Sequence, residues 1–178
     1  MLEPRRQLGQ LAGQFVKHNP QRLYAWKNYI IKKTNYIMAL SNDWIVGFVD
    51  GEGCFSYSCL RNDELRFKYQ IQGEFTVVQH KRDIQLLYKL KEHFGCGSVS
   101  VNHGTRWHYR VKNLDQLLTI IIPFFEKHQL QTVKKFQLPV FKEIATCLKN
   151  KEHLEHDGFE KCKSLVKRLG ELKRIENS

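Results

Sequence analysis

Nine residues, Ile45–Gly53 with the sequence IVGFVDGEG, restrict the fold of this chain more than any other segment. Residues 41–43 suit a helix start, and an apolar helix from Trp44 to about Gly51 would follow. Gly47 and Gly51 are four residues apart, so they lie on one face of that helix. A glycine in a helix costs up to about 1 kcal/mol relative to alanine. This face is therefore expected to pack closely on a neighbour, either a strand or a second helix.

Two acids close the same segment. Asp50 and Glu52 lie at the predicted helix end, where the negative pole of the helix dipole makes carboxylates unfavourable. Acids placed against this field suggest a bound cation. Mg²⁺ accepts carboxylate and carbonyl oxygens and keeps several of its waters.

Two strands are expected after the glycines. A segment of alternating character covers Cys54–Arg61, a turn is expected at Asn62–Asp63, and a longer strand starts at Arg66. The polar face of the longer strand is usually solvated, but on a basic protein it also suits the readout of base edges. Its apolar face holds Phe67, Tyr69, Ile71, Phe75 and Val77, and its polar face holds Lys68, Gln70, Gln72, Glu74 and Thr76.

The rest of the chain alternates helices with one hairpin. Asp83 is a candidate cap for a helix that ends at Gly95 and Gly97, and Trp107, Tyr109 and Val111 are expected to face the core. This order of elements predicts an α+β domain with one antiparallel sheet. The remaining expected elements are a helix over Ile84–Phe94, strands over Ser98–Val101 and Arg106–Lys112, and helices over Leu114–Ile122, Thr132–Lys149 and Gly158–Ile175.

The net charge of +11 favours a polyanionic partner, with nucleic acid ahead of simple solubility. Composition does not choose between DNA, RNA and an acidic membrane surface. No transmembrane helix is expected, because the longest apolar run, Leu117–Phe125, is broken by Thr119 and Pro123. No membrane partner is expected. No secretory signal is expected either.

Five cysteines occur without a CxxC pair, so neither a disulfide framework nor a zinc site is expected. Reduced, buried thiols are the simplest interpretation. The eight histidines also lack the spacing of a zinc protease or a His-Asn-His site.

Residues 4–42 contain seven Lys or Arg residues and no acid. Three interpretations stay open for this extension: an arm that follows phosphates, an organelle transit peptide, and a translated leader before a second start at Met38.

With these features in place, the motif IVGFVDGEG resembles that of the LAGLIDADG homing endonuclease family, single-motif type. The FGCGSV segment at Phe94, the PFFEKH segment at Pro123 and the lysine pair at Lys134 fit the family as well. The resemblance covers residues 41–149. It implies an αββαββα core with one antiparallel, saddle-shaped sheet. The expected divisions are a basic N-terminal extension over 1–40, the endonuclease core over 41–150, and a basic helical segment over 151–178 packed on the core.

The resemblance also implies roles for particular residues. Because the motif occurs once, a homodimer is expected, with Gly47, Gly51, Asp50 and Phe48 at its interface. Glu52 would bind Mg²⁺ (or Mn²⁺) with the Gly51 carbonyl, and Asp50 would be mainly structural. The family often has Asp where this chain has Glu52. The implied catalytic residues are Glu52, Lys134 and Gln79.

The implied activity is metal-dependent cutting of a long, nearly palindromic site in double-stranded DNA, with 3′ overhangs, which promotes intron mobility. One alternative is an intron maturase that binds intron RNA. Another is a non-cutting regulator, which would need a further domain. Expected localisation is a chloroplast or mitochondrion for an organellar intron, and otherwise the bacterial or archaeal cytoplasm. The expected DNA-binding side chains are those of Ser56, Ser58, Leu60, Asn62, Lys68, Gln70, Gln72, Glu74, Thr76, Ser100, Asn102, Arg106, His108 and Arg110.

Overall fold

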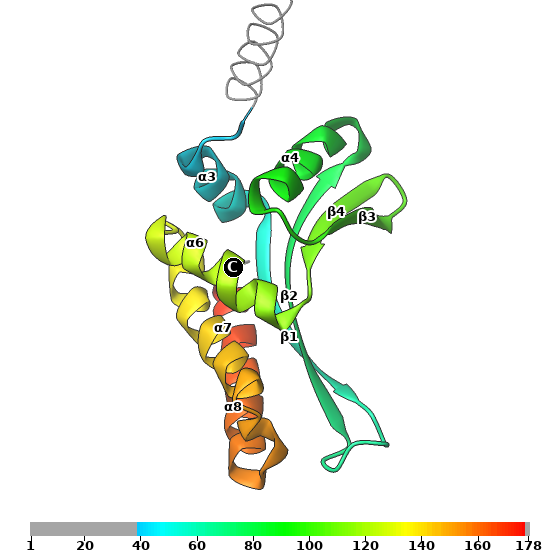
Figure 1. Ribbon diagram of the computed structural model, residues 1–178, viewed down its shortest axis with the longest axis vertical. Coiled ribbons are helices and arrows are strands. Elements are labelled where there is room, and N and C mark those ends of the chain that lie inside the picture. The colour runs from blue at the N-terminus through cyan, green and yellow to red at the C-terminus, as the bar shows by residue number, and fades with distance from the viewer. Residues whose placement is uncertain (1–38, 177–178) are drawn as a thin grey trace, which may run out of the picture. The chain divides into compact units, whose positions relative to one another are not determined.

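The computed structural model describes residues 39–176, so the three interpretations of the N-terminal extension lie outside the described residues, apart from its last few positions. The expected α+β class is confirmed by four antiparallel strands and their helices (Figure 1). The longer elements are α3 (Asn42–Glu52), β1 (Gly53–Arg61), β2 (Tyr69–His80), α4 (Ile84–Phe94), β3 (Ser98–His103), β4 (Arg106–Val111), α6 (Ile122–Lys127), α7 (Lys134–Lys149) and α8 (His156–Glu176). Short helical turns are η1 (Lys81–Asp83), α5 (Leu114–Gln116), η2 (Leu117–Ile121) and η3 (Glu152–Leu154).

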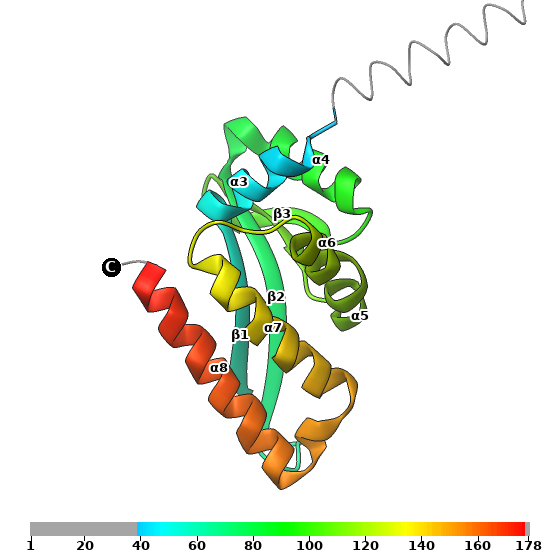
Figure 2. The ribbon, with the colours of Figure 1, turned by 90° about the vertical axis from the view of Figure 1, so that its left-hand side faces the viewer.

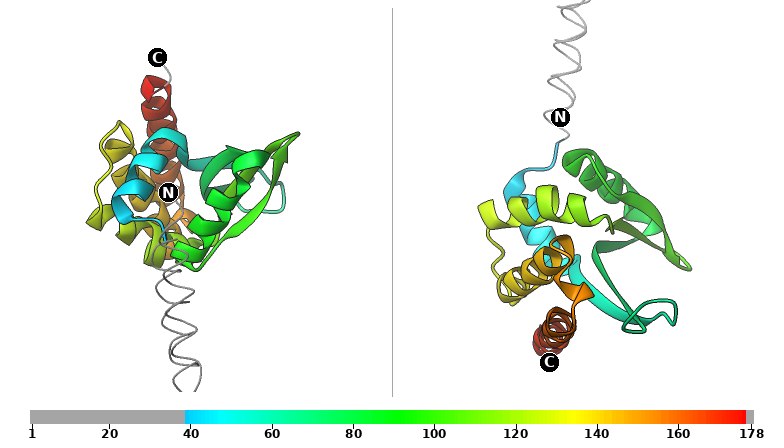
Figure 3. Two further views of the ribbon diagram at one scale, coloured as in Figure 1. Left: turned by 90° about the horizontal axis from the view of Figure 1, so that it is seen from above. Right: turned by 60° about the horizontal axis from the view of Figure 1, so that its bottom comes forward.

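One four-stranded sheet in the order β1-β2-β4-β3 organises these elements. The long strand β2 pairs with β1 through residues 69–77 and with β4 through residues 75–80. Helices α6, α7 and α8 lie to one side of the strands (Figures 2 and 3). Of the helices in the described part of the chain, those named here cover one face of the sheet and none lies on the other. Among the described residues, no helix is both long and apolar enough to cross a bilayer.

The core lies between the helices and the covered face of the sheet. Phe55 is fully buried and its ring centroid lies 5.1 Å from that of Phe75, 5.6 Å from Phe125 and 5.4 Å from Phe141. Tyr109 on β4 is also fully buried. Because side chains alternate between the faces of a strand, the two-residue period of the sequence places these aromatic rings together.

Helix α3 begins and ends as its sequence predicts. The Ser41 hydroxyl accepts a hydrogen bond from the Trp44 amide at 3.2 Å, which caps the helix start. Val49 and its neighbours on the same stripe are buried in the core. At Gly53 a Cβ atom would collide with the Val49 side chain and carbonyl, so only glycine allows this tight exit into β1.

The β1–β2 hairpin differs from the prediction at its tip. The second strand begins at Tyr69, because Lys68 adopts a left-handed conformation (φ 62°) and its carbonyl accepts the Asn62 amide at 2.8 Å. Lys68 therefore lies in the loop and not on the polar strand face. Phe67 also lies in the loop, where its ring stacks on Phe159 of α8 at 4.8 Å.

Two helix boundaries also differ from the prediction. Asp83 makes no side-chain capping bond to α4; instead His80 accepts from the Arg82 amide and caps η1. The helix expected to stop at Pro123 continues as α6. The π turn η2 precedes it, and Pro123 stands in the first turn of α6, where a missing N–H costs little.

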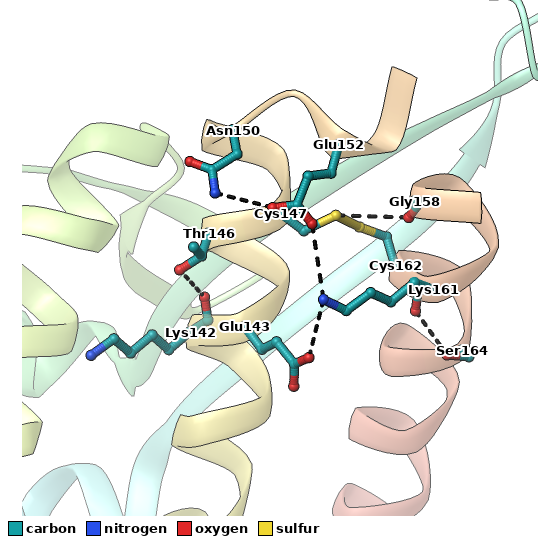
Figure 4. Close-up of a disulfide and its surroundings, with 10 residues drawn as sticks. All are labelled: Lys142, Glu143, Thr146, Cys147, Asn150, Glu152, Gly158, Lys161, Cys162 and Ser164. Atoms are coloured by element: carbon teal, nitrogen blue, oxygen red, sulfur yellow. Dashed lines mark hydrogen bonds and ion pairs between the residues drawn. A yellow bond between two sulfur atoms is a disulfide. The ribbon is translucent and has the colours of Figure 1, made fainter. Parts of the chain in front are cut away.

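The expectation that all cysteines are reduced is wrong for one pair. Cys147 of α7 and Cys162 of α8 form a disulfide (Figure 4), while Cys54, Cys59 and Cys96 are free. The two sulfurs meet because α8 packs along α7, with Cα atoms 6.9 Å apart. Their separation of 15 residues in sequence carries no local signal of this pairing.

Candidate active site and nucleic-acid interface

The open face of the sheet collects most of the polar side chains expected to contact DNA. Strand registers set Ser56 opposite Glu74, Ser58 opposite Gln72 and Leu60 opposite Gln70 across β1 and β2. Thr76 stands opposite Arg110 on β4, which in turn stands opposite Ser98 on β3. These side chains, all polar except Leu60, lie on one face because the two-residue period runs along the paired strands, with a register shift in β3 between Val101 and His103.

Polar contacts on this face link three strands. The Glu74 carboxylate lies 3.8 Å from Arg110 of β4 and 3.8 Å from Lys112, the residue that follows β4. The Nε2 atom of His108 lies 3.0 Å from the Ser100 hydroxyl on β3, and only 7% of His108 is exposed. Burial lowers the pKa of His108, and Arg110 lowers it further. His108 thus belongs to the floor of the face, whereas Arg106, at the edge, is exposed.

Asp50, the first acid of the motif, is fully engaged in holding the loop before α7. Its carboxylate accepts the amides of Gln131 at 2.8 Å and Thr132 at 3.2 Å. It also accepts the Thr132 hydroxyl at 2.6 Å. With three donors on its two oxygens, Asp50 ties the end of α3 to the 129–133 loop.

Lys134 also stabilises the connection between the end of α3 and the segment before α7. It is 1% exposed, and its Nζ atom donates to the Asp50 carbonyl at 2.7 Å. The last carbonyls of a helix lack partners within the helix and attract cations. The Lys134 ammonium therefore stabilises the C-terminal turn of α3 directly.

Glu52, the second acid, is exposed. It lines an open hollow of about 610 Å³ at the end of β2, where Gln79 is a second wall residue. The other lining residues are Val78, His80, Asn102, Thr105 and Arg106. The structure thus brings Glu52 and Gln79 together at the edge of the open face, and Lys134 is not among the residues around this hollow.

The residues present fit a divalent metal only as part of a site. Glu52 offers one exposed carboxylate, and the Gly51 carbonyl is next to it in the chain. Within residues 39–176 no three His, Cys, Asp or Glu side chains form a cluster that could hold an ion. Mg²⁺ sites often combine one or two carboxylates with waters and substrate phosphates, so this donor set is compatible with Mg²⁺ bound together with a phosphate.

Among residues 39–176, no neighbour covers the outer face of α3. A Cβ atom added at Gly47 or at Gly51 would meet no atom within 4 Å. Beside these glycines Trp44 is 40% exposed, and its ring stacks on Phe48 with centroids 4.7 Å apart. An apolar helix face without a neighbour is suited to close packing with another helix.

Sequence reasoning missed several residues of the site. Lys112 ends a predicted strand and carries no predicted role, yet it shares Glu74 with Arg110. No function is predicted for His80 or Thr105, and both line the hollow. Their place at the meeting of two hairpins depends on tertiary pairing, although the alternation of β2 already puts His80 on the polar face. The loop residues Asn62 and Lys68 lie at the far tip of the β1–β2 hairpin.

Comparison with known proteins gives consistent results. The model of the LAGLIDADG endonuclease family matches residues 45–145. "Probable intron-encoded endonuclease 2" of Neurospora crassa is 32% identical over 122 residues, which are 67% of this chain and 27% of that protein. The chain thus spans about a quarter of the length of the first curated relatives it matches.

Two solved structures extend the likeness to the fold. The homing endonuclease I-TnaI has a TM-score of 0.70 and 40% identity, covering 78% of this chain and 97% of that one. I-SmaMI, a LAGLIDADG homing endonuclease solved bound to cleaved DNA, has a TM-score of 0.69 and 35% identity, covering 71% of this chain and 42% of that one. Over these 71–78% of the chain, the fold therefore has counterparts in solved endonucleases.

Proposed function

Because this chain belongs to the LAGLIDADG endonuclease family, we propose that it cuts double-stranded DNA at a specific site and so promotes the mobility of an intron. The observation that carries this proposal is the hollow at the end of β2. There Glu52, delivered by α3, and Gln79, delivered by β2, stand together at the edge of the open sheet face. DNA lying on that face would bring a phosphate to the hollow.

We propose that the residues of the hollow carry out the chemistry and that Asp50 and Lys134 hold them in place. Glu52 and the Gly51 carbonyl would hold Mg²⁺ or Mn²⁺, which supplies an activated water and neutralises charge on the phosphate. Gln79 would orient a water with its amide group, which can both donate and accept. Lys134 is proposed to act through position: by fixing the Asp50 carbonyl, it holds the turn from which Glu52 projects.

Recognition is proposed to use the open face of the sheet. The exposed arginine and lysine side chains would contact phosphates or guanine, and Gln70, Gln72 and Ser58 would read base edges. The +11 net charge supports this partner, since each phosphate neutralised releases counterions.

The assembly is proposed to be a homodimer formed through α3. One chain contributes one Glu52, and cutting both strands requires two such acids. The open faces of Gly47 and Gly51 allow two α3 helices to pack closely, with Phe48 and Asp50 beside the seam. A two-fold dimer would recognise a nearly palindromic site, and cuts with a fixed stagger would leave 3′ overhangs.

Cleavage of plasmids that carry intron-less alleles, in the presence of Mg²⁺, tests the proposal. The native protein should cut one allele, and Glu52→Gln should lower the single-turnover rate constant by about a thousandfold. Glu92→Gln, an equal change at an exposed position of α4, should cut at the native rate. Sequencing of the ends gives the overhang, and sedimentation of the protein on the recovered duplex should show two copies.

Three outcomes contradict parts of this proposal. Equal cutting by the native protein and Glu52→Gln would remove Glu52 from the active site. A single copy on the cut duplex would remove the homodimer. Binding of intron RNA without cleavage of any allele would favour the maturase alternative.

A further inference from the structure

His80 has a role that neither the motif nor the metal site accounts for. It is the last residue of β2 and caps the η1 turn, where its Nδ1 atom accepts the Arg82 amide at 3.2 Å. A nitrogen that accepts a hydrogen bond carries no proton, so the neutral ring must carry its proton on Nε2. The backbone thus selects one tautomer and leaves a single N–H donor on the opposite edge of the ring.

His80 lines the same hollow as Glu52 and Gln79, and in the sheet register it stands opposite Arg106, which also lines it. The Lys81 amide donates to the Thr105 carbonyl at 2.8 Å, which ties the end of β2 to the β3–β4 turn. His80 and Arg106 are therefore held side by side by backbone pairing.

Both signs of charge line the hollow, and the positive one stands opposite His80. Of the described residues that line the hollow, Glu52 is the one carboxylate, whereas Arg106 brings a full positive charge. Asp83, the nearest acid along the chain, is paired with Arg82 at 3.0 Å and does not line the hollow. A neutral N–H beside a guanidinium is suited to hold two oxygens of one phosphate.

We infer that His80 is a further catalytic residue, whose Nε2–H donates to a non-bridging oxygen of the phosphate that is cut. Negative charge on those oxygens increases as the attacking water adds to phosphorus, and a donor fixed in advance stabilises that change. Arg106, on the neighbouring β-strand β4, binds the same phosphate. The inference rests on the proposed DNA cleavage and adds a residue to it.

Two substitutions separate this role from the capping of η1. In His80→Asn the side-chain oxygen takes the place of Nδ1, so it can still accept the Arg82 amide, but nothing replaces the Nε2–H. In His80→Gln the amide N–H₂ reaches about as far as Nε2, so a donor is restored while the cap is lost. A capping role predicts damage from Gln, and a donor role predicts damage from Asn.

The experiment uses the full chain and the duplex that the native protein cuts. The readouts are the single-turnover rate constant at saturating protein, the affinity for the same duplex in EDTA, and the unfolding temperature. His80→Asn should lower the rate constant by about 10- to 100-fold, with affinity within about threefold and the unfolding temperature unchanged. His80→Gln should stay within about fivefold of the native rate constant.

Native-like cutting by His80→Asn would overturn the inference while leaving the proposed function intact. So would a loss of rate confined to His80→Gln, which is the signature of a cap. A native protein that cuts no duplex would end both proposals together. As an independent readout, the ¹⁵N shifts of the His80 ring in the free protein should show the Nε2–H tautomer, and an Nδ1–H tautomer would also overturn the inference.

Discussion

The two faces of the sheet are built from the same strands and have opposite physical characters. On β1, Phe55 is fully buried against three aromatic rings, while the next residue, Ser56, faces the open side opposite Glu74. On β4, buried Tyr109 lies between His108 and Arg110, which face the other way. Neighbouring residues of one strand thus have different roles. Residues on the covered face pack in the core, and residues on the open face can vary without altering the fold.

A similar contrast between a structural and an exposed side chain occurs at the end of α3, between Asp50 and Glu52, which are two positions apart. Asp50 accepts three hydrogen bonds from the 129–133 loop, and Lys134 donates to its carbonyl. Glu52 is exposed in the hollow. One acid of the motif fixes the backbone, and the other is left available for chemistry. This contrast separates residues that should affect stability from those that should affect cleavage.

The largest expected effect comes from a pair of neighbours on β1. Phe55→Ala should lower the free energy of unfolding by about 3–5 kcal/mol, because it leaves a cavity among packed aromatic rings. Ser56→Ala should change it by less than about 0.5 kcal/mol and should alter only the preference for target sequence. Urea denaturation of both variants measures the difference, and similar losses of stability would contradict the separation of the two faces.

The two acids of the motif give a smaller effect. Asp50→Asn should cost about 1–3 kcal/mol of stability, because an amide N–H₂ replaces one oxygen that accepts backbone amides. Glu52→Gln should leave the unfolding temperature unchanged. Thermal unfolding by circular dichroism tests both variants. If Asp50→Asn unfolds like the native protein but loses cleavage as Glu52→Gln does, then Asp50 belongs to the chemical site and the contrast fails.

Periodicity predicted most of this fold, because it reflects burial. The alternation in Cys54–Arg61 and the helical stripe in Ile84–Phe94 specify which side chains face the core, and the observed elements follow them. The open-face residues were predictable for the same reason, since residues that avoid the core must face the other way. The likeness of the motif then indicated where on that face the chemistry should lie.

Features that depend on tertiary contacts were not predictable in this way. Lys134 is typical in sequence of a solvated helix residue, yet its ammonium is buried on a carbonyl 84 positions away. Cys147 and Cys162 meet only because α8 packs along α7. His80 has no sequence signal for its cap or its hollow, since both depend on where β2 meets η1 and the β3–β4 turn.

The smallest expected effect concerns His108, which shares features of both faces. It lies on the polar side of the sheet, yet it is almost buried. Burial is the main cause that lowers the pKa of His108, and Arg110 is the next. Glu74 raises this pKa and Lys112 lowers it. The unfolded chain therefore binds a proton more readily than the folded chain does. Stability is fully present above the pKa of about 6.5 of an unfolded histidine and is lost as pH falls from there towards the lower pKa of the folded state.

Replacing His108 by Gln should remove this part of the pH dependence while keeping a hydrogen-bond partner for Ser100. The native protein should lose stability more steeply than His108→Gln as the pH falls below about 6.5, with equal slopes above about pH 7. His93, whose pKa burial also lowers, is present in both proteins and cancels in the comparison. Urea denaturation at each pH measures the two slopes. Equal slopes of unfolding free energy against pH in both proteins would mean that His108 is as accessible to protons as the exposed side chains of the open face. The contrast between the two faces would then not hold at this position.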